Sequence, residues 1–459
     1  MQPSVLCAAL RVSRPGKALN QSISGIPKHR PAGASEQSLA IRGQNVRVTW
    51  RSVLGIGALL IVGALPEARA NTPVAAATRS LSVVERGKYL TEAGDCESCH
   101  TRPGGAPFSG GRAFKTKFGT IYSPNITPDV ASGIGSWSLV DLRRAMHEGI
   151  AAGGYRLFPA FPYPQFAEVS GEDVAAIYAY LRTLPSVHYS PPPNGLLFRQ
   201  RWAMRFWNLL FFKTRQFVPD ATKSKEWNRG AYLVEGLGHC SACHTPRNIF
   251  MAEMPARQYS GGHLLDKVNG GNIRRWSAVD LTSSKTGLAA WSVDDLAKYL
   301  KTGVSRRAGV FGPMNEVIDN SLEHLSVEDI HAMAIYLKSL PSQDSSVAGP
   351  SAAEITAGAK IYHDNCEDCH MSSGRGGFLS APPLAGSAVV QADDPASLIN
   401  IILYGPDTPK DISLGPWETM KPYKNSLGDS EIAAVSNYVR GSWGNRASAV
   451  TSAEVASQR

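Results

Sequence analysis

The sequence predicts an all-α fold made of three small domains in tandem. A Cys-x-x-Cys-His frame occurs three times, and a helix-forming segment precedes and follows each frame. No sheet-forming run of any length appears. The predicted domains cover residues 80–185, 222–341 and 353–445, and we call them the first, second and third units.

Six of the seven cysteines lie in the three frames, and the seventh is Cys7 in the N-terminal extension. A structural zinc site needs four ligands, whereas each frame offers three and the frames are more than 120 residues apart. A redox dithiol does not require the histidine. Covalent attachment of haem uses every residue of the frame, because the two thiols bond the haem vinyl groups and the histidine ligates the iron.

The sequence therefore predicts three covalently bound haem c groups. The attachment residues are Cys96 and Cys99, Cys240 and Cys243, and Cys366 and Cys369, and the proximal iron ligands are His100, His244 and His370. Each unit is then expected to be a class I cytochrome c domain, in which the haem replaces much of a conventional core.

Each unit opens and closes with a helical pattern. The opening segments contain Arg86–Leu90, Arg229–Leu233 and Ala357–Tyr362, and the closing segments are Asp173–Leu181, Asp329–Leu337 and Glu431–Val439. Apolar residues of the closing segments recur at i, i+3, i+4 and i+7, which is typical of a helix lying on a core.

Methionine is expected as the second axial ligand of an electron-transfer haem, from the loop before the closing helix. Met314 fits this position in the second unit and Met420 in the third. The first unit has Phe161 there, and its only methionine, Met146, lies in a helical core pattern beside His147, which is expected to face solvent. The first haem is therefore expected to be five-coordinate, to use another ligand, or to bind Met146 after a local rearrangement.

Residues 1–70 have the features of a leader. Residues 46–70 contain a charged start, an apolar run and an Ala-Arg-Ala end, as in a secretory signal peptide. The preceding residues are interpreted as a mis-assigned translation start, and an uncleaved anchor is the alternative. We expect export, because c-type haem is attached outside the cytoplasm.

The leader also accounts for most of the positive charge. It carries nine of the 47 basic and two of the 38 acidic residues, so the rest of the chain has a net charge of only +2. The high isoelectric point therefore gives no reason to expect a nucleic-acid partner.

Further motifs accompany the three frames: Ser123–Asp129, Gly133–Ser138, Pro159–Tyr163 and Asn437–Asn445. Together they resemble the triheme cytochrome c subunit of membrane-bound periplasmic dehydrogenases of the alcohol, gluconate, sorbitol and fructose types. Related subunits serve aldehyde or N-heterocycle dehydrogenases. The resemblance covers about residues 80–445.

This resemblance implies a separate catalytic subunit with a flavin, PQQ or molybdenum cofactor that oxidises an alcohol, sugar, sugar acid or aldehyde. It also implies that the haems pass electrons to ubiquinone, a terminal oxidase or another cytochrome at the periplasmic face of the membrane. No catalytic site is predicted in this chain. The alternative is a free-standing multihaem carrier or a haem peroxidase-like enzyme using an open first haem, although no His–Arg pair lies near Phe161.

Residues 196–213 interleave aromatic side chains with Arg and Lys. Such a segment is typical of a surface that docks on a membrane. It could equally pack between the first two units, because linkers commonly bury aromatic anchors. The sequence leaves both interpretations open.

Overall fold

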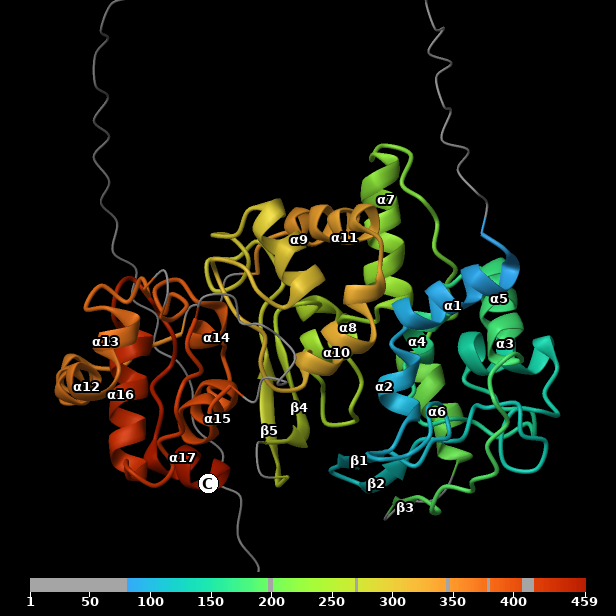
Figure 1. The fold of residues 1–459 in the computed structure, drawn as a ribbon, viewed down its shortest axis with the longest axis horizontal. Helices are drawn as coiled ribbons and strands as arrows, with labels where there is room; N and C mark the ends of the chain where they lie inside the picture. Colours follow the sequence, from blue (N-terminus) through green and yellow to red (C-terminus); the bar gives the residue numbers. More distant parts are fainter. Residues whose placement is uncertain (1–80, 197–200, 269–270, 344–346, 378–379, 407–416) are drawn as a thin grey trace, which may run out of the picture. The chain divides into compact units, whose positions relative to one another are not determined.

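The computed structural model describes residues 81–196, 201–268, 271–343, 347–377, 380–406 and 417–459 (Figure 1). The predicted leader, residues 1–70, lies outside the described residues. Helices dominate, but two small antiparallel sheets are also present, so the all-α prediction is right only in part.

Each unit is built on a crossing pair of helices, one from its beginning and one from its end. These pairs are α1 (Val83–Ala93) with α5 (Gly171–Leu181), α7 (Lys225–Ala231) with α11 (Val327–Ser339), and α12 (Ala352–Asn365) with α16 (Asp429–Gly441). Helix α7 continues into a π-helical segment, Tyr232–Leu237.

A glycine permits each crossing. A Cβ atom added at Gly87, Gly230 or Gly358 would lie 1.9, 2.0 or 2.1 Å from the carbonyl oxygen of an alanine in the closing helix, namely Ala176, Ala332 and Ala434 in turn. No side chain fits in that space, so the close backbone approach requires glycine. The same close helix–helix contact thus recurs in each of the three units.

The other helices lie between or beyond these pairs. The first unit contains α2 (Cys96–His100), α3 (Leu139–Glu148) and α4 (Tyr163–Phe166), and α6 (Ala203–Phe211) follows it. The second unit contains α8 (Ser241–His244), α9 (Val293–Thr302) and α10 (Met314–Asn320), with 3-10 turns at Pro255–Arg257 and Leu322–His324. The third unit contains α13 (Glu367–His370), α14 (Ala388–Gln391), α15 (Ala396–Tyr404) and α17 (Ser452–Gln458). Helix α17 lies beyond the expected end at residue 445 and packs on α15 and α16. None of the helices in these ranges combines the length and the apolar character that crossing a bilayer requires.

The unpredicted strands are short. Strands β1 (Ala113–Thr116), β2 (Gly119–Tyr122) and β3 (Gly195–Leu196) form one sheet, and β4 (Gly262–Lys267) pairs with β5 (Ile273–Ala278) in the other. In β4 the exposed and half-buried residues alternate, so this strand buries little of its own surface. The strands have at most six residues, and β4 (Gly262–Lys267) contains no β-branched or aromatic residue, so the sequence pattern for a strand is short or weak.

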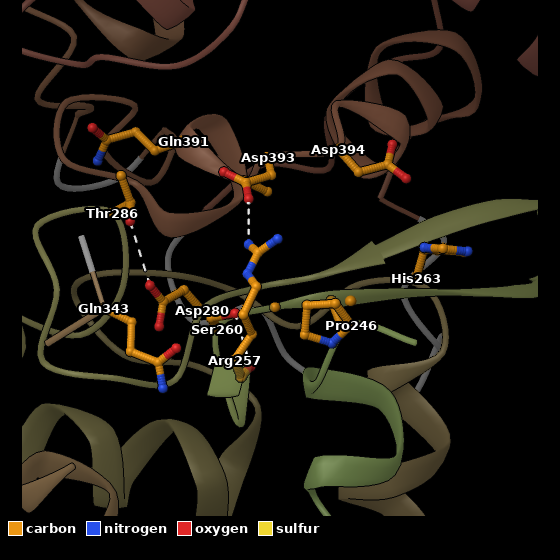
Figure 2. A pocket seen from close by; sticks show the side chains of 14 residues that line it. Pro246, Arg257, Ser260, His263, Asp280, Thr286, Gln343, Gln391, Asp393 and Asp394 are labelled. Atoms are coloured by element: carbon orange, nitrogen blue, oxygen red, sulfur yellow. Dashed lines mark hydrogen bonds and ion pairs between the residues drawn. The ribbon is translucent and has the colours of Figure 1, made fainter. Parts of the chain in front are cut away.

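Strand β5 joins the second unit to the third. Its Trp276 is buried in the core of the third unit, and the Ser277 N–H donates to the Ser397 hydroxyl over 2.9 Å. A polar pocket adjoins this seam, and in Figure 2 the Arg257 guanidinium reaches across it to Asp393 at 2.9 Å. The pocket is thus occupied in part by an ion pair that holds the two units together.

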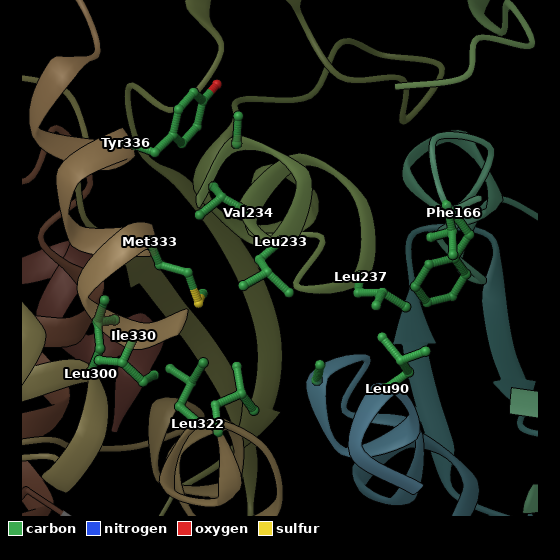
Figure 3. Close-up of a cluster of buried hydrophobic side chains, with 14 of the residues drawn as sticks. Leu90, Phe166, Leu233, Val234, Leu237, Leu300, Leu322, Ile330, Met333 and Tyr336 are labelled. Carbon is green, nitrogen blue, oxygen red and sulfur yellow. The ribbon is translucent and has the colours of Figure 1, made fainter. Parts of the chain in front are cut away.

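The first and second units share one hydrophobic core (Figure 3). Leu90 and Phe166 of the first unit lie against Leu237 of the second. Hydrogen bonds across this boundary are reciprocal: Tyr89 donates to Asp329 over 2.6 Å, and Tyr232 donates to Asp173 over 2.5 Å. The two units therefore contact each other through equivalent parts of their crossing helices.

Candidate haem sites

Each Cys-x-x-Cys-His frame forms a short helical turn, α2, α8 or α13, close to the crossing helices. The residue before the first cysteine has a left-handed backbone in two units, with φ of +48° at Asp95 and +37° at His239. This sharp change of direction ends the opening helix and starts the frame.

None of the six frame cysteines forms a disulfide within the described residues. Burial raises the pKa of Cys96, Cys99 and Cys240 to about 12 and that of Cys366 to about 11. A reactive dithiol needs a lowered thiol pKa in an electropositive, accessible place. The environment of these thiols therefore argues against redox-dithiol chemistry.

The three frame histidines are oriented in the same way. Nδ1 of His100 lies 2.8 Å from the Pro124 carbonyl oxygen, Nδ1 of His244 lies 2.7 Å from that of Val279, and Nδ1 of His370 lies 3.0 Å from that of Pro382. A carbonyl oxygen only accepts, so Nδ1 carries the proton and Nε2 keeps its lone pair. Nε2 is thus free to ligate iron, and the carbonyl fixes the orientation of the ring.

Burial also lowers the pKa of all three histidines, although the hydrogen bond to the carbonyl opposes the shift. Each ring is therefore held in the neutral form that binds a metal ion. The described residues contain no group of three or more His, Cys, Asp or Glu side chains that could hold a metal ion by themselves.

Two buried donor atoms of the second unit fit a haem as well. The hydroxyl of Tyr259 and Nε of Arg307 are buried, and neither has a hydrogen-bond partner among the described residues. Tyr259 belongs to the core on which Cys240 packs, and Arg307 precedes Met314 in the same loop. Buried donors are normally satisfied, and haem propionates are acceptors supplied from outside the chain.

The loops before Met314 and Phe161 have the same backbone hydrogen bond. The Val310 N–H donates to the Gly303 carbonyl and the Leu157 N–H to that of Gly149, each over 2.7 Å. Met314 and Phe161 each follow four residues later, so the two positions correspond. The ring of Phe161 packs against the ring of Phe166, with centroids 5.3 Å apart. The second unit has the thioether of Met314 at the position of Phe161.

Met420 packs at the edge of the third core, to which Cys366 of the third frame also belongs. Three residues later, the Tyr423 N–H donates to the Ile402 carbonyl over 2.9 Å, and the Tyr423 hydroxyl donates to the carbonyl of Asn365. Asn365 directly precedes Cys366, so Tyr423 ties the methionine segment to the frame.

Met146 is only 6% exposed and belongs to the shared core of the first two units. His147, expected to face solvent, is buried instead. Burial lowers the pKa of His147, and the nearby Val169 carbonyl opposes this shift. In the second unit Lys301 donates to the equivalent carbonyl, that of Leu325. The prediction for His147 is wrong, because His147 occupies the position of Lys301, whose ammonium group donates to a carbonyl oxygen at the end of a turn.

The first two frames are each contacted by the other unit. Asn320, at the end of α10, donates to the Ser98 hydroxyl in the first frame over 2.9 Å. Gln165, in α4, donates to the Ser241 hydroxyl in the second frame, also over 2.9 Å. Sequence patterns did not single out these four residues, because nothing local marks a contact between residues so far apart.

The fold and the sites together define a c-type cytochrome with three covalently attached haem groups. Comparison with known proteins agrees: the cytochrome c family model matches residues 84–185, and that of cytochrome C oxidase, cbb3-type, subunit III matches residues 353–439. The chain is 40% identical over 398 residues to the gluconate 2-dehydrogenase cytochrome c subunit of Pantoea cypripedii, covering 82% of this chain and 90% of that relative. It is 38% identical over 390 residues to the cytochrome c subunit of the quinone alcohol dehydrogenase of Gluconobacter oxydans, covering 81% of each.

The chain therefore belongs to the family of dehydrogenase cytochrome c subunits, and it transfers electrons within such a complex. It is also 38% identical over 402 residues to one of the nicotinate dehydrogenase subunits of Pseudomonas putida. That match covers 84% of this chain but 33% of the relative, so this chain spans about a third of that protein.

Proposed function

We propose that this chain takes electrons from a separate catalytic subunit that oxidises an alcohol, sugar, sugar acid or aldehyde, and delivers them to ubiquinone or a terminal acceptor. The catalytic subunit carries a flavin, PQQ or molybdenum cofactor, and the complex works at the periplasmic face of the membrane. The observation that carries the proposal is the 40% identity with a gluconate 2-dehydrogenase cytochrome c subunit, 90% of whose length this chain covers.

The chain contributes three frames, predicted to lie in domains of residues 80–185, 222–341 and 353–445, whose cysteines attach haem and whose histidines present Nε2 to it. A bound haem supplies an iron that takes up and releases one electron at a time. We propose Met314 and Met420 as the sixth ligands of the second and third sites. Their place before the closing helices and their packing against the cores support this assignment.

For the first site we propose three alternatives. The sixth position stays open beside Phe161, Met146 reaches the iron after a movement of α3, or another residue ligates the iron. A difference in this ligand would give the first site a different potential from the other two. A carbon monoxide titration separates the open site from the other two alternatives, because carbon monoxide binds readily only where the sixth position is open.

The reciprocal contacts of the first two frames suggest a route between them. Asn320 and Gln165 hold each frame against the opposite unit. The Cys243 thiol lies near enough to Cys99 for its charge to help raise the pKa of Cys99. We propose that this boundary is where an electron passes from one of the first two sites to the other.

Extraction from membranes in mild detergent, followed by mass spectrometry of the co-purifying chains, tests the proposed function. A large dehydrogenase subunit is expected, and its substrate should reduce all three haems in the visible spectrum. A chain that is isolated alone and is not reduced by such a partner would contradict the proposal and favour a free-standing carrier.

A further inference from the structure

Helix α6 packs against the first unit with one face only. Asn208 is buried in this face and hydrogen-bonds the Tyr163 hydroxyl over 2.6 Å. The ring of Tyr163 lies edge-on to that of Phe212, with centroids 5.0 Å apart. Arg201, just before the helix, donates to the Arg156 carbonyl over 2.8 Å. This side of the segment confirms the packing interpretation of its sequence.

The opposite face of α6 is apolar and exposed. Trp202, Phe206, Leu209 and Leu210 recur at i, i+4, i+7 and i+8, and they are 59%, 59%, 80% and 70% exposed. A soluble helix normally turns such a stripe toward a core. Here the stripe faces outward, and contiguous exposed apolar surface of this kind marks a site of interaction.

A loop of the second unit extends this surface. Ile249 and Phe250 are 80% and 57% exposed. The Trp207 indole N–H donates to the Phe250 carbonyl over 3.0 Å, and the rings of Phe211 and Phe250 are 5.7 Å apart. We call the six exposed residues Trp202, Phe206, Leu209, Leu210, Ile249 and Phe250 the apolar stripe.

The charges beside the apolar stripe are positive. Arg205 and Lys213 are exposed, and neither forms an ion pair within the described residues. The sequence contains no Asp or Glu between residues 201 and 219. Aromatic and leucine side chains with flanking cations match the interface of a bilayer, where apolar groups enter the acyl region and cations meet anionic headgroups.

We propose that the apolar stripe docks the protein on an anionic lipid surface. A second copy of the chain is a poorer occupant, because a symmetric contact would bring Arg205 and Lys213 of both copies together. This inference rests on the proposed function, whose membrane contact it specifies. Ile249 and Phe250 lie five and six residues after His244 of the second frame, so docking places this loop of the second unit at the lipid.

Flotation of the holoprotein with vesicles tests the proposal. Vesicles of phosphatidylethanolamine and phosphatidylglycerol should bind the wild type, and Leu209→Gln with Leu210→Gln should weaken binding by about tenfold per leucine. Arg205→Gln should weaken binding about fivefold to these vesicles but not to phosphatidylcholine. The matched control is Val130→Gln with Val327→Gln, which replaces valines that are 73% and 67% exposed on other elements and should bind as the wild type does.

Wild-type-like flotation of the leucine variant would overturn the proposal. So would sedimentation showing that the wild type is a dimer and the leucine variant a monomer, or loss of the catalytic subunit without loss of lipid binding. The visible spectrum and reduction by the dehydrogenase partner should be unchanged in the variant, so failure of docking is distinguishable from failure of the proposed function.

Discussion

The Tyr89 hydroxyl donates a 2.6 Å hydrogen bond to the Asp329 carboxylate, although the two residues are 240 positions apart in the chain. The same hydroxyl accepts from the Ser326 N–H over 3.1 Å. Tyr232 makes the equivalent pair of contacts with Asp173 and the Ser170 N–H. Each opening helix thus caps the closing helix of the other unit, and the first two haem sites are held as a pair.

Replacing Tyr89 with Phe should weaken the second unit, although the substitution is in the first. We expect a loss of about 2 kcal/mol, since the acceptor is a charged carboxylate. Hydrogen–deuterium exchange should accelerate at the Ser326 amide, which loses its acceptor. The control is Tyr178→Phe, which removes a 2.8 Å hydrogen bond to the Trp137 carbonyl inside the first unit. Equal exchange at Ser326 in both variants would refute coupling through Tyr89.

The Asp329 carboxylate should make the free energy of unfolding depend on pH in the acid range. Burial alone would raise its pKa, but hydrogen bonds from Arg229 and Tyr89 hold the pKa below the ordinary value of 3.8. The folded protein therefore binds this proton less readily than the unfolded chain does. The stabilisation is present above about pH 4 and is lost as the pH falls through the lower pKa of the folded state.

Asp329→Asn should therefore lower the free energy of unfolding by about 2 kcal/mol at neutral pH, and the difference from wild type should shrink in acid. Denaturant unfolding followed by circular dichroism at several pH values measures both effects. Asp294→Asn is the control, because the Asp294 side chain is 94% exposed. A pH-independent difference between Asp329→Asn and wild type would contradict the assignment.

The crossing glycines should not tolerate alanine. In a helix with free space, Gly→Ala usually stabilises by about 1 kcal/mol. At Gly230 the new Cβ would meet the Ala332 carbonyl oxygen, so the helices must separate and stability should fall by about 1–3 kcal/mol. Gly171→Ala is the control, because only a flexible arginine atom lies near, at 3.7 Å. In thermal unfolding, the melting temperature should fall in Gly230→Ala and rise in Gly171→Ala.

The repeat explains how much of the fold could be predicted. The helical patterns of the opening and closing segments are local features, and the structure confirms a helix in both places in each unit. Gly87, Gly230 and Gly358 lie in the opening patterns, but only the structure reveals what they approach. The sequence already placed Phe161 at the methionine position of the first unit, and its backbone hydrogen bond in common with the loop before Met314 supports that placement.

The way in which the units join could not be predicted. Trp276 lies in a strand whose neighbours are mostly charged or small, and it is buried by another unit rather than by its own. His147 aligns with the lysine Lys301, but it is buried in the packed first unit, beside the turn that contains Val169. Contacts of this kind depend on tertiary packing, which short-range patterns do not contain.

The proposed methionine ligands can be tested one site at a time. Leucine conserves the volume of methionine but cannot ligate iron, so Met314→Leu should keep the fold and lose one methionine-to-iron charge-transfer band in the near infrared. The potential of one haem should fall, since methionine ligation raises it. Met333→Leu is the control, because Met333 is 1% exposed and its sulfur lies among Ile330, Leu322 and Leu233 (Figure 3). A redox titration with three unchanged potentials in Met314→Leu would show that another residue occupies the second site.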